Sequence, residues 1–590
     1  GRSAGSVATS DVVDDEGGSD MEAAPSEATA DGQQDGVAQQ LHALRSRLGE
    51  IAVPDEEAYR IAFEADASKT MAANTAHRTR LSKLAADLKK LLGAGGGGTA
   101  DEKEAINWER ADSVLSDFNK VLGQSQREAD FALVLRQGCA GFVVDICLKI
   151  KDSLPLFASS GERQASQTWR QMSNVMASAL KWLGVVCKHD FARVFMLLTN
   201  RVVLLTDVAL AFLDTQSISV LFLPQVLHVL SLHMKQNMPN SPERLVHTLS
   251  SYLLLCGLPA KLRELFRRAE IKGLKLFEGA SPLPLLLLRA MGLLGNLISA
   301  YNPPHRAEAE QPVQAFQPVG ELGCSAGEGE TSLVASQAIL DMFKQTELLG
   351  ILSVLVSILL GEGKKITSQS PNTAAAKLPQ TVVSLCFQSV RILNNIARLD
   401  LATLQETLGA CRRQELYHLL VCLIDYCTSR LQGGKPDKLS EENELLHETI
   451  VLMGYCCLQK EENQSIMCYG EGQTLLVKIT SLPLHYFMDP HGRGVLFPTI
   501  LATCFMSRQN LALLRSEMNL SLLQSFLATN QQKLEESRGA AGEEPADAGF
   551  SGRFPTALWA EAMRFFGEEE ASEDASPLES PRPQGRSASE

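Results

Sequence analysis

The sequence has few aromatic side chains and none of the short motifs that mark common enzymes. Aromatic residues make up 6% of the chain while apolar residues make up 45%, so the apolar content is mainly aliphatic, as is typical of helical proteins. The patterns G-x-S-x-G, H-E-x-x-H, G-x-x-x-x-G-K-[ST] and the dinucleotide fingerprint are missing. The glycine run 95–98 has no Lys-Ser/Thr after it and predicts a linker. We expect no enzyme activity, catalytic residue, cofactor or small-molecule substrate. The alternative of a hydrolase whose site is hidden by divergence stays open.

The chain is also poor in positive charge and in paired cysteines. A formal net charge of −14 argues against a globally basic nucleic-acid binder. The cysteine count is odd, at 13, and cysteines such as Cys422 stand in apolar stretches, which indicates reduced thiols. Cys456, Cys457, Cys468 and His447 are close in sequence, but the spaced pairs of a structural zinc site are missing. We expect no bound metal.

Long hydrophobic runs are absent as well. The apolar stretch 348–360 has only 13 residues, fewer than the roughly 18–20 that a spanning helix requires. Asp207, Asp214 and Pro224 interrupt the longer run 202–234. No signal peptide follows the first residue, and a start at Gly1 suggests a fragment of a longer protein. We expect no transmembrane segment in this fragment.

Amphipathic helical spacing is what the sequence does have. From 102 to about 535, apolar residues recur at helical spacing, as at Val382, Cys386 and Val390. Ser440, followed by two glutamates, predicts an N-cap, and strand signals are scarce. We predict an all-α protein, a degenerate armadillo/HEAT-like α-solenoid with disordered N- and C-terminal tails. A single large helical bundle is the alternative.

Composition divides the chain into segments, because stretches of small and acidic residues cannot bury enough apolar surface to offset the entropy of ordering. The predicted order is a disordered acidic tail at 1–40, a helical preface at 41–92, a Gly-rich linker at 93–101, the solenoid at 102–535 with disordered loops at about 302–331 and 361–377, a loop at 536–552, a C-terminal helix at 553–567 and a disordered acidic Ser-Pro tail at 568–590.

A basic stripe is the first candidate partner surface. At 100° per residue, Lys261, Arg268, Lys272 and Lys275 fall within about 60° of each other, with no acid between them, beside an apolar helical face. Such a patch would contact phosphates, as in ribosomal RNA, or an acidic partner. An ordinary solvated face is the alternative, and Gly273 would scatter the stripe if it ended the helix.

Asparagines in the middle of helices are the second candidate surface. Asn296 and the pair Asn394-Asn395 stand in apolar helical segments, as on the inner helices of armadillo proteins, where asparagine bonds the backbone of an extended peptide. The alternative is a polar residue that satisfies a carbonyl near a helix end.

The third candidate is the segment 482–498, rich in proline, histidine and aromatic residues. Pro483, Pro490 and Pro498 each predict a break in the helix, and loops carry function more often than helix faces. The alternative is that its aromatic residues cap the core. The candidate residues on this predicted connection are His485, Tyr486, Phe487, Asp489, His491 and Arg493.

Two kinds of short motif bear on a cell-cycle role. Arg78-Thr79-Arg80-Leu81 contains an Arg-x-Leu-like docking string. Minimal proline-directed phosphorylation sites stand at Ser241-Pro242, Ser281-Pro282, Ser370-Pro371, Ser576-Pro577 and Ser580-Pro581. Both motifs arise often by chance, so neither identifies a cyclin partner by itself.

A family resemblance rests on turn and packing motifs between 445 and 518. These motifs are Leu445-Leu446-His447-Glu448, Gly454-Tyr455, Glu462-Asn463-Gln464, Leu482-Pro483, Tyr486-Phe487, Asp489-Pro490, Leu496-Phe497-Pro498, Gln509-Asn510 and Glu517-Met518. Weaker echoes occur at 78–92, 391–397, Arg553-Phe554-Pro555, Trp559 and Phe565-Phe566. In these the chain resembles the C-terminal region of the SCAPER family, the S phase cyclin A-associated proteins of the endoplasmic reticulum.

The resemblance implies an adaptor in the cytoplasm, associated with the endoplasmic reticulum. Members of the family are expected to link a ribosome-bound tetratricopeptide-repeat factor, which recognises nascent tubulin, to the deadenylase complex that degrades tubulin mRNA. The alternative is a scaffold that holds cyclin A and its kinase at the endoplasmic reticulum. Family members are expected to carry a zinc finger and a coiled coil upstream of this region.

Overall fold

The structure is a computed structural model, and its helices span most of the sequence between the two ends. It describes residues 39, 41–46, 75–93, 106–124, 128–153, 163–189, 193, 196, 201–214, 222–234, 243–272, 283–301, 340–346, 350–359, 378–409, 412–432, 440–469, 473–539 and 548–568. Across these ranges the regular structure is helical and contains no strand. The all-α prediction is therefore confirmed, whereas the armadillo/HEAT-like class stays a prediction. The predicted tails, glycine linker and two internal loops lie almost wholly outside the described residues.

The helices of the first half are α2 Thr75–Gly93, α3 Trp108–Gly123, α4 Glu128–Arg136, α5 Cys139–Asp152, α7 Arg163–Val186, α9 Arg201–Asp214, α10 Leu223–His233, α11 Glu243–Leu255, α12 Leu258–Lys272 and α13 Leu283–Ser299. Those of the second half are α15 Ile351–Leu359, α17 Gln380–Leu399, α18 Leu401–Gly409, α19 Arg413–Gln432, α20 Glu441–Cys457, α21 Glu461–Gln464, η3 Ser465–Cys468, α22 Leu475–Thr480, α23 His485–Met488, α24 Pro490–Cys504, α25 Arg508–Glu517, α26 Ser521–Gly539, α27 Ala548–Ser551, η4 Thr556–Leu558 and α28 Trp559–Glu568.

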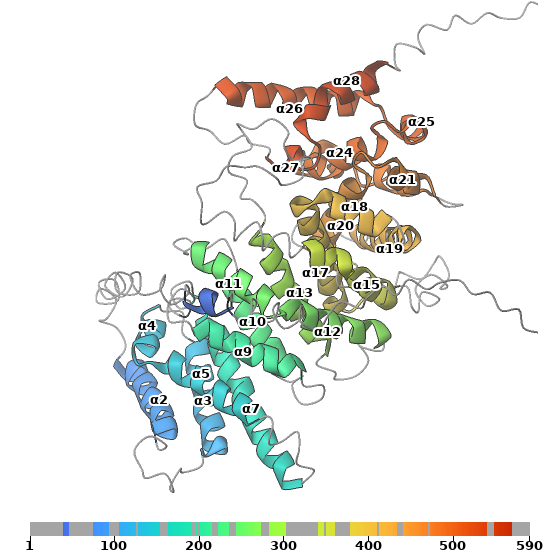
Figure 1. Cartoon of the computed structure of the whole chain (residues 1–590). Helices are drawn as coiled ribbons and strands as arrows, with labels where there is room; N and C mark the ends of the chain where they lie inside the picture. The colour runs from blue at the N-terminus through green and yellow to red at the C-terminus, as the bar shows by residue number, and fades with distance from the viewer. Residues whose placement is uncertain are drawn as a thin grey trace, which may run out of the picture.

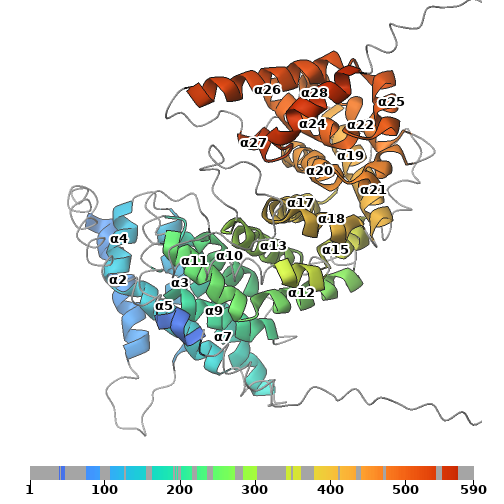
Figure 2. The same cartoon turned by 45° about the horizontal axis from the view of Figure 1, so that its top comes forward.

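Most helices lie in two files that run side by side along the molecule. In one file α3, α7, α10, α13, α17, α20 and α24 each contact the next, and in the other α2, α5, α9, α12, α15, α19, α22 and α25 do the same. Contacts such as α9 with α10 and α19 with α20 join the files. The chain therefore advances from the blue end to the red end in both views (Figures 1 and 2), where α26 and α28 pack together.

The amphipathic sequence explains how the helices pack and where they begin. Along α17, Val382, Cys386, Val390 and Leu393 are all fully buried, which confirms the predicted apolar stripe. The helix after it in the same file, α20, begins as expected, because Ser440 accepts a hydrogen bond from the Asn443 backbone N–H.

The end of the stack is closed by aromatic residues, which are scarce elsewhere. Phe497 of α24 contacts Phe526 of α26, and Phe526 contacts Phe550 of α27. Phe550 in turn stacks on Trp559, with ring centroids 4.6 Å apart. Large rings that contact several helices at once bury much apolar surface, so they seal the final pair of helices onto α24.

Candidate functional site

The basic stripe of α12 is interrupted by an acid, so the prediction of a stripe without acids is wrong. Glu264 pairs with Arg268 at 3.0 Å and with Arg267 at 2.8 Å. The hydrogen bonds from these two arginines lower the pKa of Glu264 to about 2. Lys272 is exposed at the last position of α12, and Lys275 lies outside the described residues.

The other cations of the stripe are also neutralised or set apart. Arg268 is partly neutralised, since its Nε donates to the carboxylate of Glu264. Lys261 is half-buried at the other end of the helix, about three turns before Lys272. The helix ends just before Gly273. The described part of the stripe therefore presents separated cations and not a continuous patch.

The candidate asparagines tie neighbouring helices of one file together. Asn296 of α13 donates to the backbone and hydroxyl oxygens of Ser231 on α10, at 2.9 Å each. Asn394 of α17 donates to the backbone oxygen of Glu448 on α20 at 2.9 Å and to its carboxylate at 2.6 Å. Asn395 donates back to Ser299 of α13 at 3.0 Å. These amide donors are engaged inside the fold, and the peptide-binding role stays a prediction.

The segment 482–498 is mostly helical, so the predicted connection is corrected. Residues 485–488 form α23, and Pro490 stands at the first position of α24, where its missing N–H costs nothing. Pro498 lies inside α24 instead of ending it. A proline there cannot donate to the oxygen of Gly494, four residues earlier. Arg553 supplies that bond instead, its Nη1 donating to the Gly494 oxygen at 2.9 Å.

Arg553 thus joins the C-terminal helices to the proline-containing helix. Its Nη2 donates to the oxygen of Val495 at 2.7 Å and to the hydroxyl of Thr499 at 2.8 Å. Thr499 in turn donates to the Ile450 oxygen of α20 at 2.8 Å. Burial lowers the pKa of Arg553 to about 10, so the guanidinium keeps its charge at neutral pH.

The predicted residues of this segment divide into buried and exposed groups. Tyr486 is fully buried and donates to the Asn443 side-chain oxygen at 3.1 Å. Phe487 is half-buried and lies 6.3 Å from Phe497, between ring centroids. His485 and His491 are exposed.

Asp489 and Arg493, the remaining candidates, occupy the junction between the two helices. Asp489 separates α23 from α24, its backbone oxygen accepting from the Arg493 backbone N–H at 2.9 Å. Both side chains are half-buried. Their backbones shape the turn, and a partner contact through their side chains stays a prediction.

A histidine cluster surrounds Tyr486. The ring of His447 on α20 lies 5.6 Å from Tyr486 and 5.3 Å from His491, between centroids, and His485 is 4.4 Å from Tyr486. Burial, followed by the nearby His491, His485 and Arg553, lowers the pKa of His447 to about 4. The imidazole of His447 is therefore neutral at pH 7. Within the described ranges no group of three or more His, Cys, Asp or Glu side chains is placed to hold a metal ion.

The apolar surface of α23 was missed by the sequence reasoning. Leu484 and Met488 stand four residues apart and are 72% and 68% exposed, so they lie on one face of the helical turn. We call these two residues the α23 patch. Their spacing in LPLHYFM was the available signal, but the prediction of a loop hid it.

Buried amides were a second omission. Asn463 and Gln464, quoted above as motif residues, are 0% and 2% exposed. Asn463 donates to the oxygen of Cys456 at 2.9 Å, and Gln464 donates to the oxygens of Ala502 and Phe505 at 3.0 and 2.8 Å. They satisfy carbonyls that the ends of α20 and α24 leave without intrahelical partners.

The same role extends to two residues outside that motif. Gln405 of α18 donates to the oxygens of Tyr455 and Leu458, at 2.8 Å each. Asn510 of α25 donates to the oxygens of Gln464 and Thr503, at 3.0 and 2.7 Å. The recognisable motifs are therefore devices that terminate helices and fix their neighbours.

The cysteines give no sign of reactivity. Eleven cysteines are described, and each is a free thiol. This agrees with the prediction of reduced thiols. Burial raises the pKa of Cys456 and of Cys504 to about 12, so these thiols stay protonated and are poor nucleophiles. Among the described helices, none is long and apolar enough to cross a membrane.

Comparison with known proteins gives one similarity that carries an argument. The human S phase cyclin A-associated protein in the endoplasmic reticulum is 32% identical over 235 residues, which cover 38% of this chain and 16% of that protein. This similarity confirms the predicted resemblance. No family model matches the chain.

Proposed function

We propose that this chain is a non-catalytic helical scaffold, built as a degenerate α-solenoid, that brings protein partners together. The two parallel files of helices support this architecture, since each helix contacts mainly its neighbours in the file and one helix across. Such a stack offers long surfaces for partners without a single enclosed active site. Solenoid repeats would be degenerate, because helix lengths vary from α22 to α7.

The observation that carries the proposal is the use of the polar side chains in the motifs on which the family resemblance rests. Asn463, Gln464 and Asn510 are buried and bonded to backbone oxygens of neighbouring helices. Amides used in this way stabilise a shape, and amide side chains are neither nucleophiles nor bases. The α23 patch, in contrast, exposes apolar side chains that a partner would cover.

The finer role is proposed from the resemblance. The relative is named for association with cyclin A in the endoplasmic reticulum, and we place this chain on the cytoplasmic side of that compartment. There it links a ribosome-bound tetratricopeptide-repeat factor that recognises nascent tubulin to the deadenylase complex, in the autoregulation of tubulin mRNA. Catalysis in this scheme belongs to the recruited deadenylase.

Co-purification of the chain with ribosomes from cytosol tests this role. Leu484→Asp/Met488→Asp places charge on the α23 patch, and we expect it to reduce recovery with ribosomes or the tetratricopeptide factor by about tenfold. Ile271→Asp on α12 is the matched control, because Ile271 is 72% exposed, as Leu484 is. Lys261→Glu/Lys272→Glu tests the contribution of the basic residues. If the wild-type chain never associates with either partner, the adaptor role is wrong.

The alternative function, a cyclin A scaffold, is supported by the name of the relative but not by the docking string. Leu81 of the Arg-x-Leu-like string is fully buried in α2, so a docking groove could not bind it while α2 stays packed. The five Ser-Pro sites lie outside the described residues. Binding of purified cyclin A with its kinase, lost in Arg80→Ala, would favour this alternative, and turnover of a substrate by purified protein would favour a hydrolase.

A further inference from the structure

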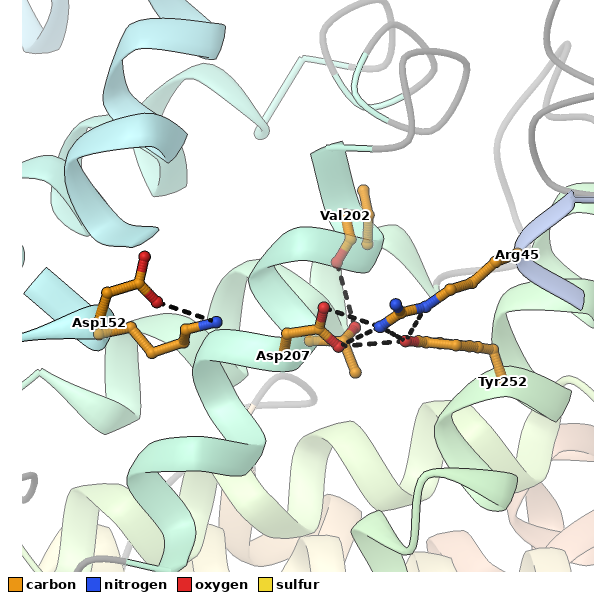
Figure 3. Close-up of polar contacts among 7 residues, drawn as sticks. Arg45, Asp152, Val202, Asp207 and Tyr252 are labelled. Carbon is orange, nitrogen blue, oxygen red and sulfur yellow. Dashed lines mark hydrogen bonds and ion pairs between the residues drawn. The ribbon is translucent and has the colours of Figure 1, made fainter. Parts of the chain in front are cut away.

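Arg45 makes a group of polar contacts between the segment 41–46 and the body of the protein (Figure 3). Arg45 Nη2 lies 2.8 Å from each carboxylate oxygen of Asp207 on α9. Arg45 Nε donates to the hydroxyl of Tyr252 on α11 at 2.8 Å, and that hydroxyl donates to Asp207 at 3.1 Å. The guanidinium carbon also lies 5.4 Å from the centre of the Tyr252 ring.

These groups together match the chemistry of a guanidinium. Both oxygens of one carboxylate lie within hydrogen-bond distance of Nη2, and a hydroxyl oxygen accepts from Nε. Burial raises the pKa of Tyr252, so the hydroxyl keeps its proton and can donate to Asp207 while it accepts from Arg45. Tyr252 itself is 1% exposed, which holds the acceptor in a fixed position.

The docked segment is too small to be held firmly. Residues 41–46 are helical, and of their apolar side chains Leu41 and Leu44 are half-buried against the core. A helix of this length is not stable alone in water, and the Arg45 side chain is 50% exposed. The docking therefore depends on Arg45 and on the two leucines, which stand on the same face as i and i+3.

We propose that Asp207 and Tyr252 form a binding site for an arginine-bearing amphipathic helix, and that the occupant is the chain's own segment 41–46, held as a releasable latch. Because the segment is tethered to the same chain, its effective concentration at the site is high. Release of the latch exposes the surface that Leu41 and Leu44 cover. This site lies outside the surfaces used in the proposed function.

A labelled peptide of residues 36–50 tests the site in the full-length chain. Arg45→Glu in the chain places a carboxylate beside Asp207, which vacates the site. We expect the wild-type peptide to bind this variant at least about tenfold more tightly than it binds the wild-type chain, where the cis segment competes. Fluorescence anisotropy of the labelled peptide reports binding.

Three controls make the test specific. A peptide with Arg45→Ala should bind the Arg45→Glu chain at least about tenfold more weakly than the wild-type peptide, and adding Asp207→Asn to the chain should cause a similar loss. Arg391→Glu, which reverses an exposed charge on α17, should leave peptide binding as in the wild-type chain. Thermal unfolding of each variant checks that the fold survives.

Three results would contradict the proposed latch. Equal binding of the peptide to wild-type and Arg45→Glu chains would mean that the segment does not occupy the site in cis. Failure of the peptide to bind the folded Arg45→Glu chain would mean that Asp207 and Tyr252 do not form a site for an arginine helix. A dimer that dissociates on dilution and is lost in Arg45→Glu would assign the occupant to a second copy and overturn the cis latch.

Discussion

Among the described buried polar side chains, bonds to the backbone of another helix are commoner in the C-terminal region, α17 to α28, than in the N-terminal region, α2 to α12. Arg193, which bonds the Leu232 oxygen, is an exception in the N-terminal region, and Thr449, which bonds its own helix, is one in the C-terminal region. In the N-terminal region Thr206, His233 and Ser250 are fully buried, and each bonds the backbone oxygen four residues earlier in its own helix. In the C-terminal region Gln464 and Asn510 bond the backbones of other helices. Both arrangements satisfy a buried polar group, but only the second fixes how two helices lie against each other.

The motifs on which the family resemblance rests lie mainly between 445 and 518, in the C-terminal region, where amides bond neighbouring helices. A hydroxyl that bonds its own helix can be replaced by an apolar residue with little cost, because no other helix depends on it. An amide that terminates a neighbouring helix has fixed length and direction, so few residues can replace it. The C-terminal motifs are therefore specific enough to recognise in a sequence.

Removal of Arg553 should have the largest effect on the C-terminal region. Arg553→Leu leaves the Gly494 oxygen without a donor, because Pro498 cannot replace it, and also removes the bonds to the Val495 oxygen and the Thr499 hydroxyl. With about 1–3 kcal/mol for each buried group left unsatisfied, we expect a loss of about 3 kcal/mol in the free energy of unfolding. Chemical denaturation followed by circular dichroism measures it.

Two variants show whether the effect is specific to this contact. Arg391→Leu removes an exposed arginine of α17 and should change stability by no more than about 0.5 kcal/mol. Arg553→Lys keeps the charge but cannot reach all three acceptors, so it should recover only part of the stability. A loss in Arg553→Leu no larger than that in Arg391→Leu would contradict the assigned role.

The fold class was predictable from the sequence because periodicity is local. The buried stripe of α17 and the Ser440 cap depend only on residues within a few turns. The pairing of Glu264 with Arg268 was also local, at i and i+4, and could have been predicted. The expectation of no acid among the four cations overlooked Glu264, although both arginines lie within reach of its flexible carboxylate.

The candidate site was less predictable because its contacts join distant segments. Continuation of α24 through Pro498 depends on Arg553, more than fifty residues later. Without that donor a proline inside a helix is correctly expected to end it. In the same way, Arg45 and Tyr252 are separated by 207 positions, and no local pattern connects an isolated arginine with a buried tyrosine.

Acid should weaken both regions to a similar extent, because burial and not interhelical bonding sets the relevant pKa values. Burial, with Arg193 nearby, lowers the pKa of His233 to about 4, and His447 is similarly lowered to about 4. In the unfolded chain each histidine is protonated as the pH falls below about 6.5. In the folded chain His233 and His447 stay neutral until about pH 4. Stability should therefore be full above pH 6.5 and fall towards pH 4, by up to about 3 kcal/mol for each histidine.

Replacement of each histidine separates the two contributions. His233→Leu and His447→Leu should each remove its share of the acid sensitivity, measured as the free energy of unfolding at pH 7 and pH 4.5. His418→Leu, at an exposed position of α19, should leave the pH dependence unchanged. Acid sensitivity confined to His447 would show that the histidine cluster of the C-terminal region, and not burial, sets the pH dependence.

Replacement of a glycine should change the free energy of unfolding least, but it compares the two regions most directly. One glycine of each region, Gly184 of α7 and Gly454 of α20, lies in the same file of helices. A methyl group at Gly184 of α7 would meet His228 at 3.8 Å, an ordinary contact, so Gly184→Ala should stabilise the chain by about 0.5–1 kcal/mol through helix propensity. At Gly454 of α20 it would meet the Thr499 hydroxyl at 2.8 Å and its Cα at 3.3 Å, so Gly454→Ala should cost about 1–3 kcal/mol. Thr499→Ala should reduce that cost in the double variant, because it removes the nearer atom but not the backbone. If thermal unfolding shows Gly454→Ala to be as harmless as Gly184→Ala, α20 and α24 are no more closely joined than the helices of the N-terminal region.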